Sequence, residues 1–259
     1  MEERKQKEVE YYDEQALRQN SLAGQTVVQE DFFPVLGSHK FLYAIAGPVC
    51  DGKRVLDYGC GEGIHIPFLA RHAGEVAGID LSEGALAIAR KHACQEGIGE
   101  DRVKFLVMDC EKLEFPEHSF DVVFDGGTFS SLDFGKAIAE ITRVLRPDGV
   151  LVGIETFGHN PLANAKRALN RITGKRTSWA ASHIVRQKEL ARLRQNFERV
   201  EVFYFHLISL FAFPLLDSPG GRLMLRLLEG IDDLPLRIPF LQKYAFKIVF
   251  VCKNPRRDR

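Results

Sequence analysis

The sequence is poor in cysteine, and its few cysteines do not form a recognisable framework. Five cysteines are scattered over 259 residues without a Cys-x-x-Cys pair. Because their number is odd and their spacing is wide, the sequence predicts neither a disulfide framework nor a structural metal site. Scattered free cysteines are typical of a reducing compartment, so we expect a cytoplasmic protein.

Net charge and long apolar runs are also lacking. The 35 basic side chains balance 35 acidic ones, so the whole-chain charge does not indicate a nucleic-acid partner. The longest apolar run, residues 202–216, is short for a membrane span and is interrupted by His206, Ser209 and Pro214. The first ten residues, MEERKQKEVE, lack the apolar core of a secretory signal. We therefore expect a soluble protein without stable membrane insertion.

Short apolar runs and helical patterns alternate from about residue 53, and this alternation is typical of βαβ units around a parallel sheet. Ser82 is the expected N-cap of one helix, and a second helix is expected over 136–146, followed by a turn at residues 147–149. Residues 1–45 are expected to form a helical extension with Tyr11-Tyr12 and Phe32-Phe33 as apolar anchors. The predicted strands are 54–58, 76–80, 103–108, 121–124, 150–155 and 246–252.

The stretch LDYGCGEG, residues 56–63, places three glycines at alternate positions after Asp57. An ordinary strand-to-helix turn needs fewer glycines, whereas a backbone that closely approaches a ligand favours them. A dinucleotide loop would have its third glycine at Ile64, and a nucleotide-triphosphate loop would continue with Gly-Lys-Ser/Thr. Asp80 closes the next predicted strand, where a carboxylate can accept hydrogen bonds from ribose hydroxyls. The pattern predicts a ribose-bearing cofactor without a pyrophosphate.

A series of motifs extends this pattern along the chain. Residues 55–63 resemble the D-x-G-x-G-x-G motif of class I S-adenosylmethionine-dependent methyltransferases, and GIDLS at 78–82 resembles their second-strand motif. The matching segments MDCE at 108–111, FDVVF at 120–124 and RVLRPDGVL at 143–151 follow in order. The resemblance covers roughly residues 50–156 and is closest to the small-molecule members of this family.

The resemblance implies a fold and a division of the chain. The implied fold is α/β, with a doubly wound, Rossmann-like, mostly parallel sheet of seven strands, helices on both faces and the last strand antiparallel. Residues 46–259 would form the methyltransferase domain, preceded by an N-terminal helical lid at 1–45. Residues 157–245 would contain helical insertions on the acceptor side.

The resemblance also implies roles in binding S-adenosylmethionine, from which S-adenosylhomocysteine would be the product. Asp57 would support the loop and the methionine ammonium region, Asp80 would bind the ribose, and Asp109 would accept a hydrogen bond from the adenine amino group. The other residues implied in cofactor binding are Gly59, Cys60, Gly61, Gly63, Leu81, Met108, Cys110, Asp125 and Gly126.

Methyl transfer from a sulfonium depends mainly on positioning, so a base is needed only where the acceptor must lose a proton. Glu155 and His159 follow the fifth predicted strand and are the candidate catalytic residues. Glu155 could instead cap a helix, and His159 could be an ordinary surface histidine. His65, between two isoleucines, is interpreted as a packing residue. The candidate acceptor-binding residues are Tyr11, Tyr12, Thr128, Phe129 and His159.

The acceptor is indicated only broadly. Residues 160–199 carry ten basic and two acidic side chains, which fits a solvated helical face, an anionic acceptor or attraction to a membrane surface. Apart from Trp179, aromatic residues are not interleaved with these charges as a nucleic-acid groove would need, and residues 125–128 read DGGT where amino-methylating nucleic-acid enzymes have Asn/Asp-Pro-Pro-Tyr. Nucleic acid is therefore the less favoured substrate.

These observations predict O-methylation of a metabolite or biosynthetic intermediate, with an anionic or an aromatic and apolar acceptor. The alternatives are N- or C-methylation of a small molecule or of a lipid-like or quinone-like acceptor. A nicotinamide-dependent oxidoreductase and a non-catalytic cofactor-binding protein are more distant alternatives.

Overall fold

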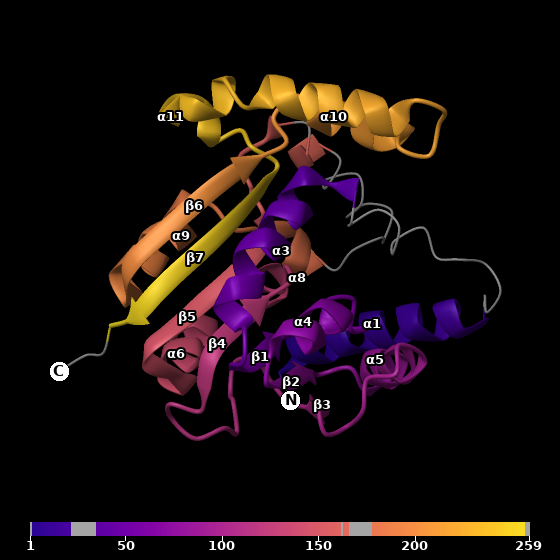
Figure 1. The fold of residues 1–259 in the computed structure, drawn as a ribbon, viewed down its shortest axis with the longest axis vertical. Coiled ribbons are helices and arrows are strands. Elements are labelled where there is room, and N and C mark those ends of the chain that lie inside the picture. Colours follow the sequence, from indigo (N-terminus) through magenta and orange to yellow (C-terminus); the bar gives the residue numbers. More distant parts are fainter. Residues whose placement is uncertain (1, 22–34, 162, 166–177, 257–259) are drawn as a thin grey trace.

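A seven-stranded sheet with the order β3-β2-β1-β4-β5-β7-β6 forms the centre of the molecule (Figure 1). The computed structural model describes residues 2–21, 35–161, 163–165 and 178–256. The first five strands run parallel, whereas β7 pairs antiparallel with both β5 and β6. The fold class expected from the sequence is confirmed. The strands are β1 (Arg54–Tyr58), β2 (Glu75–Asp80), β3 (Val103–Val107), β4 (Phe120–Asp125), β5 (Leu145–Thr156), β6 (Phe197–Phe205) and β7 (Lys247–Pro255).

Helices cover both faces of this sheet because adjacent strand residues point to opposite sides. In β1, Val55 packs with α3, α4 and α5, whereas Leu56 packs with α6 and α9. Each side is a cluster of fully buried aliphatic and aromatic residues. The helices on the two faces are α3 (Gly37–Cys50), α4 (Ile66–His72), α5 (Glu83–Gln95), α6 (Phe134–Val144) and α9 (Gln187–Asn196).

The remaining helices lie around the ends of the sheet. α1 (Glu3–Ser21) packs against α5, and α10 (Gly221–Asp232) packs against η3 (Ser209–Leu215). No helix in the described ranges is both long and apolar enough to cross a bilayer. The shorter helices are η2 (Phe129–Ser131), α8 (Ser178–Ser182), η4 (Pro235–Arg237) and α11 (Pro239–Gln242).

Two local expectations need correction. The expected helix over 136–146 ends at Val144, because Pro147 disfavours helical geometry in the residue before it and β5 already begins at Leu145. The expected turn at 147–149 is a bulge within β5, where Leu145 pairs with Phe120 and Val150 pairs with Val122. Residue 45, the expected end of the N-terminal extension, lies inside α3, and the division of the chain into parts stays a prediction. Phe32 and Phe33, the expected second anchor of the extension, lie outside the described residues.

Candidate functional site

The glycine loop joins β1 to α4 at the carboxyl edge of the parallel strands. Gly59 has φ of +71°, and a Cβ there would lie 2.3 Å from the Thr128 side chain, so only glycine fits. The Thr128 hydroxyl donates to the carbonyl oxygens of Tyr58 and Gly59, at 3.0 and 3.2 Å. Gly61 has φ of +52°, but a Cβ there would meet no atom within 4 Å. The loop is therefore packed against the segment that follows β4 on one side and open on the other.

Asp80, at the end of β2, binds the backbone of this loop at Gly61. One carboxylate oxygen accepts a hydrogen bond from the Gly61 amide at 3.0 Å, and the other accepts from the Ser82 amide at 2.9 Å. Burial raises the pKa of Asp80, and these backbone donors oppose the rise. Ser82 begins α5 as expected, since its hydroxyl accepts from the Ala85 amide at 3.0 Å. Asp80 thus couples the loop to the start of α5.

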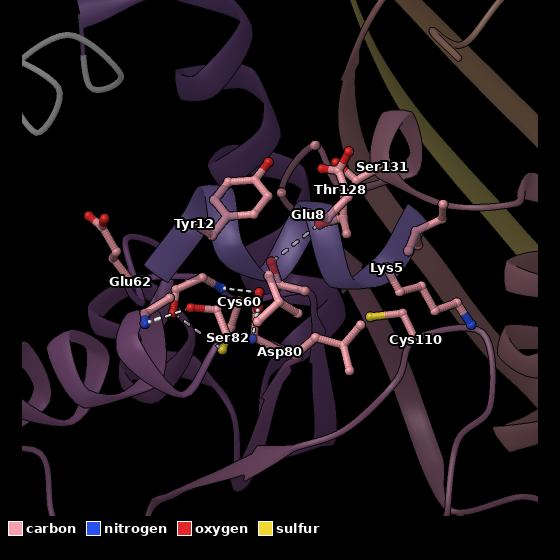
Figure 2. Close-up of a pocket in the computed structure, with 18 of the residues that line it drawn as sticks. Lys5, Glu8, Tyr12, Cys60, Glu62, Asp80, Ser82, Cys110, Thr128 and Ser131 are labelled. Carbon is pink, nitrogen blue, oxygen red and sulfur yellow. Dashed lines mark hydrogen bonds between the residues drawn. The ribbon is translucent and has the colours of Figure 1, made fainter. Parts of the chain in front are cut away.

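A cavity of about 250 Å³ lies between this loop and α1. Figure 2 shows Lys5, Glu8 and Tyr12 of α1 on one side, and Cys60, Asp80 and Cys110 from the ends of β1, β2 and β3. A cavity at the carboxyl ends of parallel strands is the usual ligand site of an open α/β sheet. The sequence-predicted residues on its wall are Tyr12, Gly59, Cys60, Gly61, Asp80, Leu81, Asp109, Cys110, Gly126 and Thr128.

Two basic side chains of α1 bind the acids that follow β3. The Lys5 ammonium group lies 2.6 Å from an Asp109 carboxylate oxygen and 3.0 Å from Glu111. Arg4 donates to Glu111 at 2.6 Å and to the Ser131 carbonyl oxygen at 3.0 Å. The Glu111 side chain has no exposed surface, so its interactions with Arg4 and Lys5 are little screened by solvent. These contacts hold the amino-terminal part of α1 over the cavity.

Asp13 fixes α1 further along the helix. Its carboxylate accepts hydrogen bonds from the Ser82 hydroxyl at 2.5 Å and the Gly84 amide at 3.2 Å. A Cβ on Gly84 would lie 2.9 Å from the same carboxylate oxygen, so glycine permits this close packing of α1 on α5. The helical extension predicted at the N-terminus is therefore a wall of the cavity in this structure.

Three acids lie behind the cavity wall. Asp57 is 1% exposed, and neither of its carboxylate oxygens has a hydrogen-bond partner among the described residues. Burial raises its pKa to about 8, and the charge of Asp80 adds to this rise. Asp125 accepts hydrogen bonds from Thr128 and Gly127, and burial, followed by the nearby Glu155, raises its pKa well above the usual range. An unpaired, buried carboxyl group beside the loop is suited to receive a cationic ligand group.

The two candidate catalytic residues do not line this cavity. Glu155 is buried, and its carboxylate accepts hydrogen bonds from the Phe129 amide at 2.7 Å and the Thr156 amide at 3.2 Å. His159 packs its ring edge-on against Phe157, and its Nε2 accepts from the Gln187 amide at 3.4 Å. Burial, and then the charge of Arg186, lower the pKa of His159. Both side chains thus bind other groups of the protein, and their catalytic roles stay predictions.

The other sequence-predicted residues also lie away from the cavity wall. Tyr11 accepts a hydrogen bond from Gln15 at 2.6 Å on α1, and Phe129 is buried at 2% exposure in the core. Met108 is buried in the core, and Gly63 allows the loop to approach Ala89 of α5. These positions shape the site from behind, and their predicted ligand contacts remain untested.

His65 is a wall residue that the sequence did not indicate. It packs against Phe124 and Tyr43, as its neighbouring isoleucines suggested, but it also faces the cavity beside Gly126. Its Nδ1 lies 2.8 Å from the Tyr43 hydroxyl, and burial lowers its pKa to about 4. A neutral imidazole on the wall can bind a polar group or orient one. Tyr43 is distant in sequence, so no local pattern could have placed this pair.

A second cavity, of about 210 Å³, adjoins the first at Leu132. Phe129 and Trp179 contribute aromatic surface to it. Arg186, Lys188 and Arg192, three of the ten basic residues counted in the sequence, lie on its wall. Five others, Lys166, Arg167, Arg171, Lys175 and Arg176, lie outside the described residues.

The fold is Rossmann-like, since the sheet is mostly parallel and a glycine loop follows β1. The acids after β2 and β3 are the type of residue that binds a nucleoside-containing cofactor in this fold. Residues 56–153 match a protein family described as methyltransferase domain. Over residues 56–153 the chain is therefore similar to S-adenosylmethionine-dependent methyltransferases, and S-adenosylmethionine is the cofactor of those enzymes.

Known proteins are similar to less than half of the chain. The ubiquinone biosynthesis O-methyltransferase of Hahella chejuensis is 36% identical over 111 residues, which are 42% of this chain and 45% of that protein. The phosphatidylethanolamine N-methyltransferase of Cereibacter sphaeroides is 37% identical over 124 residues, which are 46% of this chain and 60% of that protein. The chain thus spans about half the length of the curated relatives it matches.

A solved structure shows the same fold over more of the chain. It is phosphoethanolamine N-methyltransferase 2 of Haemonchus contortus, in complex with phosphomonomethylethanolamine and S-adenosylhomocysteine. The TM-score is 0.58 at 22% identity, and the similarity covers 85% of this chain and 54% of that one.

Proposed function

We propose that the protein transfers a methyl group from S-adenosylmethionine to a small organic acceptor, with an oxygen as the methylated atom. The observation that carries this proposal is the cavity beside α1 that is lined by the open side of Gly61 and by the Asp80 and Asp109 carboxylates. The matched family and the relatives named above support the reaction class. The cytoplasmic location expected from the sequence belongs to the same proposal.

Each wall of the cavity would have a distinct task. Asp80 would accept hydrogen bonds from the ribose hydroxyls, and Asp57 would balance the methionine ammonium group from behind the loop. Asp109 would accept a hydrogen bond from the adenine amino group, which requires Lys5 to give up part of its contact. The cofactor supplies the reactive methyl group, so these residues mainly bind and orient it. Tyr12 and Glu8 of α1 would exclude water from the acceptor end.

The acceptor would enter beside the β4 loop. The second cavity lies next to the first at Leu132 and combines Phe129 and Trp179 with Arg186 and Arg192. Aromatic surface next to guanidinium groups suits a planar acceptor that carries a carboxylate or phosphate group. We therefore include an anionic, aromatic acceptor in the proposal. Where the acceptor is a phenol or an acid, its proton can leave to a wall residue or to water.

Titration calorimetry with S-adenosylmethionine and S-adenosylhomocysteine tests the cofactor site. We expect both to bind, and Asp80→Asn to weaken binding about 10- to 100-fold, because a hydrogen bond to a charged group contributes about 1.5–3 kcal/mol. Asp101→Asn, an exposed acid outside the cavity, is the matched control and should bind like the wild type. Absence of binding by the folded wild type would contradict the proposal.

The reaction is tested by incubating the protein and cofactor with fractionated metabolite extracts. We expect a product that gains the mass of one methyl group only when both protein and cofactor are present. Labelled methyl carbon then identifies the receiving atom by nuclear magnetic resonance. Methylation of nitrogen or carbon would correct the proposed atom, whereas cofactor binding without any methylated product would remove the catalytic proposal.

A further inference from the structure

One end of the molecule carries an unusually apolar surface. Of the thirteen large hydrophobic side chains that are exposed in the described residues, nine lie between residues 208 and 240. They come from η3, α10, α11 and the residues that border these helices, and Figure 1 shows α10 and α11 as one layer at the top of the molecule, far from α1. We name this surface the α10–α11 layer. Its exposed members are Ile208, Phe211, Leu215, Leu223, Leu227, Ile231, Leu234, Ile238 and Phe240.

The outward face of α10 is a regular apolar stripe. Leu223, Leu227 and Ile231 are four residues apart, so they lie on one side of the helix, and they are 62%, 62% and 54% exposed. The opposite side is firmly attached to the protein. Leu225 is fully buried, and Asp232 accepts hydrogen bonds from the backbone amides of residues 207–209 at 2.6–3.1 Å. The stripe is therefore a fixed surface that faces solvent.

Charged side chains are sorted across the same helix. The two acids within α10 turn inward: Asp232 binds the start of η3, and Glu229 accepts from the Gly37 amide at 2.7 Å. Arg222 and Arg226 are exposed, and neither forms an ion pair with any residue that the structure describes. This sorting leaves positive charge beside the outward apolar stripe.

The neighbouring segments continue the same arrangement. Arg237 in η4 is exposed next to Ile238, and the ammonium group of Lys243 lies 4.1 Å from the centre of the Phe240 ring. Asp217 and Asp233 are also exposed here, but these two negative charges are fewer than the four positive charges of the layer. Leucine, isoleucine and phenylalanine bordered by arginine and lysine are the features of helices that lie in a membrane interface.

We propose that the α10–α11 layer docks on the surface of an anionic lipid bilayer. The apolar stripe would enter the boundary between headgroups and acyl chains, while Arg222, Arg226 and Arg237 would contact lipid phosphates. A second copy of the chain is a poorer occupant, because a symmetric contact would bring these cations against their own copies. The layer contributes no residue to the cofactor cavity, so docking leaves that cavity accessible.

Vesicle flotation with the full chain tests this docking. We expect the protein to float with vesicles of equimolar phosphatidylglycerol and phosphatidylcholine, and to remain behind with phosphatidylcholine alone. Binding should weaken as salt is added, because the attraction between surface charges is screened. The double variant Leu227→Ser, Ile231→Ser should bind at least about tenfold more weakly, given the transfer energy of two aliphatic side chains.

The matched control is Val107→Ser, which removes a side chain of 53% exposure on β3, outside the α10–α11 layer. It should bind anionic vesicles like the wild type, and circular dichroism should show both variants folded. No flotation of the wild type, or equal flotation of the double variant, would overturn the proposal. Light scattering that shows a wild-type dimer, separated by the double variant, would assign the layer to a second copy of the chain and would also overturn it.

Discussion

The Lys5 ammonium group lies 2.6 Å from an Asp109 carboxylate oxygen, which joins the first helix to the segment after β3 at the wall of the cavity. The family resemblance implies that Asp109 also accepts a hydrogen bond from the adenine amino group of the cofactor. Lys5 and an adenine ring would therefore share one carboxylate, and the position of α1 and the occupancy of the cavity should depend on each other.

The attachment of α1 should depend on the pair between Arg4 and Glu111. Arg4→Ala removes the 2.6 Å contact to Glu111, a fully buried acid. We therefore expect the packing of α1 over the cavity to become about 1–3 kcal/mol less stable. Hydrogen exchange of residues 3–17 should become faster, and the cofactor should dissociate faster. Lys7→Ala is the control, because Lys7 pairs with Glu3 on the exposed side of the same helix. Equal exchange in both variants would show that Arg4 does not hold α1.

Gly61 and Gly52 offer a matched pair for the glycine loop. Both have positive φ, +52° and +66°, and a Cβ at either position would meet no atom within 4 Å. Alanine should therefore cost each about 1–2 kcal/mol of stability through backbone strain. Only Gly61 lines the cavity, so only Gly61→Ala should also weaken S-adenosylhomocysteine binding by calorimetry. Similar affinities in the two variants would place the cofactor elsewhere.

The buried Asp57 should make the empty protein less stable as the pH rises. Its pKa is raised from 3.8 to about 8, so the folded state holds a proton that the unfolded state releases. The free energy of unfolding should therefore fall as the pH rises from about 4 to about 8, by up to about 1.4 kcal/mol for each pH unit. Asp57→Asn should remove this part of the slope. Urea unfolding of both proteins between about pH 5 and pH 8 checks it, and the wild type should lose stability more steeply than the variant. If the unfolding free energies of the two proteins changed equally with pH, the raised pKa of Asp57 would be contradicted.

His65 and His159 should respond differently to substitution. His65→Asn should weaken cofactor binding or slow methyl transfer about three- to tenfold, because this ring lines the cavity and contacts the Tyr43 hydroxyl at 2.8 Å. His159→Asn should leave cofactor affinity unchanged, since His159 lies outside the cavity wall. A fall in kcat of a hundredfold or more in His159→Asn alone, about the size of a lost general base, would support its predicted catalytic role.

The sequence predicted the fold because each parallel strand carries its own signal. Residues 54–58 form a strand with the predicted ends, since a buried run is closed by a turn on one side and by glycine on the other. The motif order also placed Asp80 and Asp109 at one edge of the sheet, where the structure shows both on the cavity wall. Here local pattern and overall topology agree.

Other parts of the site depend on residues that only the folded chain brings together. The contact of Lys5 with Asp109 joins positions 104 residues apart, and a charge pattern along the chain does not specify it. The pairing of His65 with Tyr43 is equally non-local. The exposed stripe of α10 has the periodicity of an ordinary core-facing helix, so the sequence alone does not tell which apolar side faces solvent.

The position of β7 bears on how the chain is synthesised. β7 lies between β5 and β6, although more than forty residues separate the end of β6 from its start. During translation, β5 therefore has one unpaired edge, and β6 has no paired neighbour at all, until residues 247–255 leave the ribosome. Slow synthesis or truncation before this point would leave these strand edges open to pairing with other chains, and a nascent chain of this kind should bind ribosome-associated chaperones.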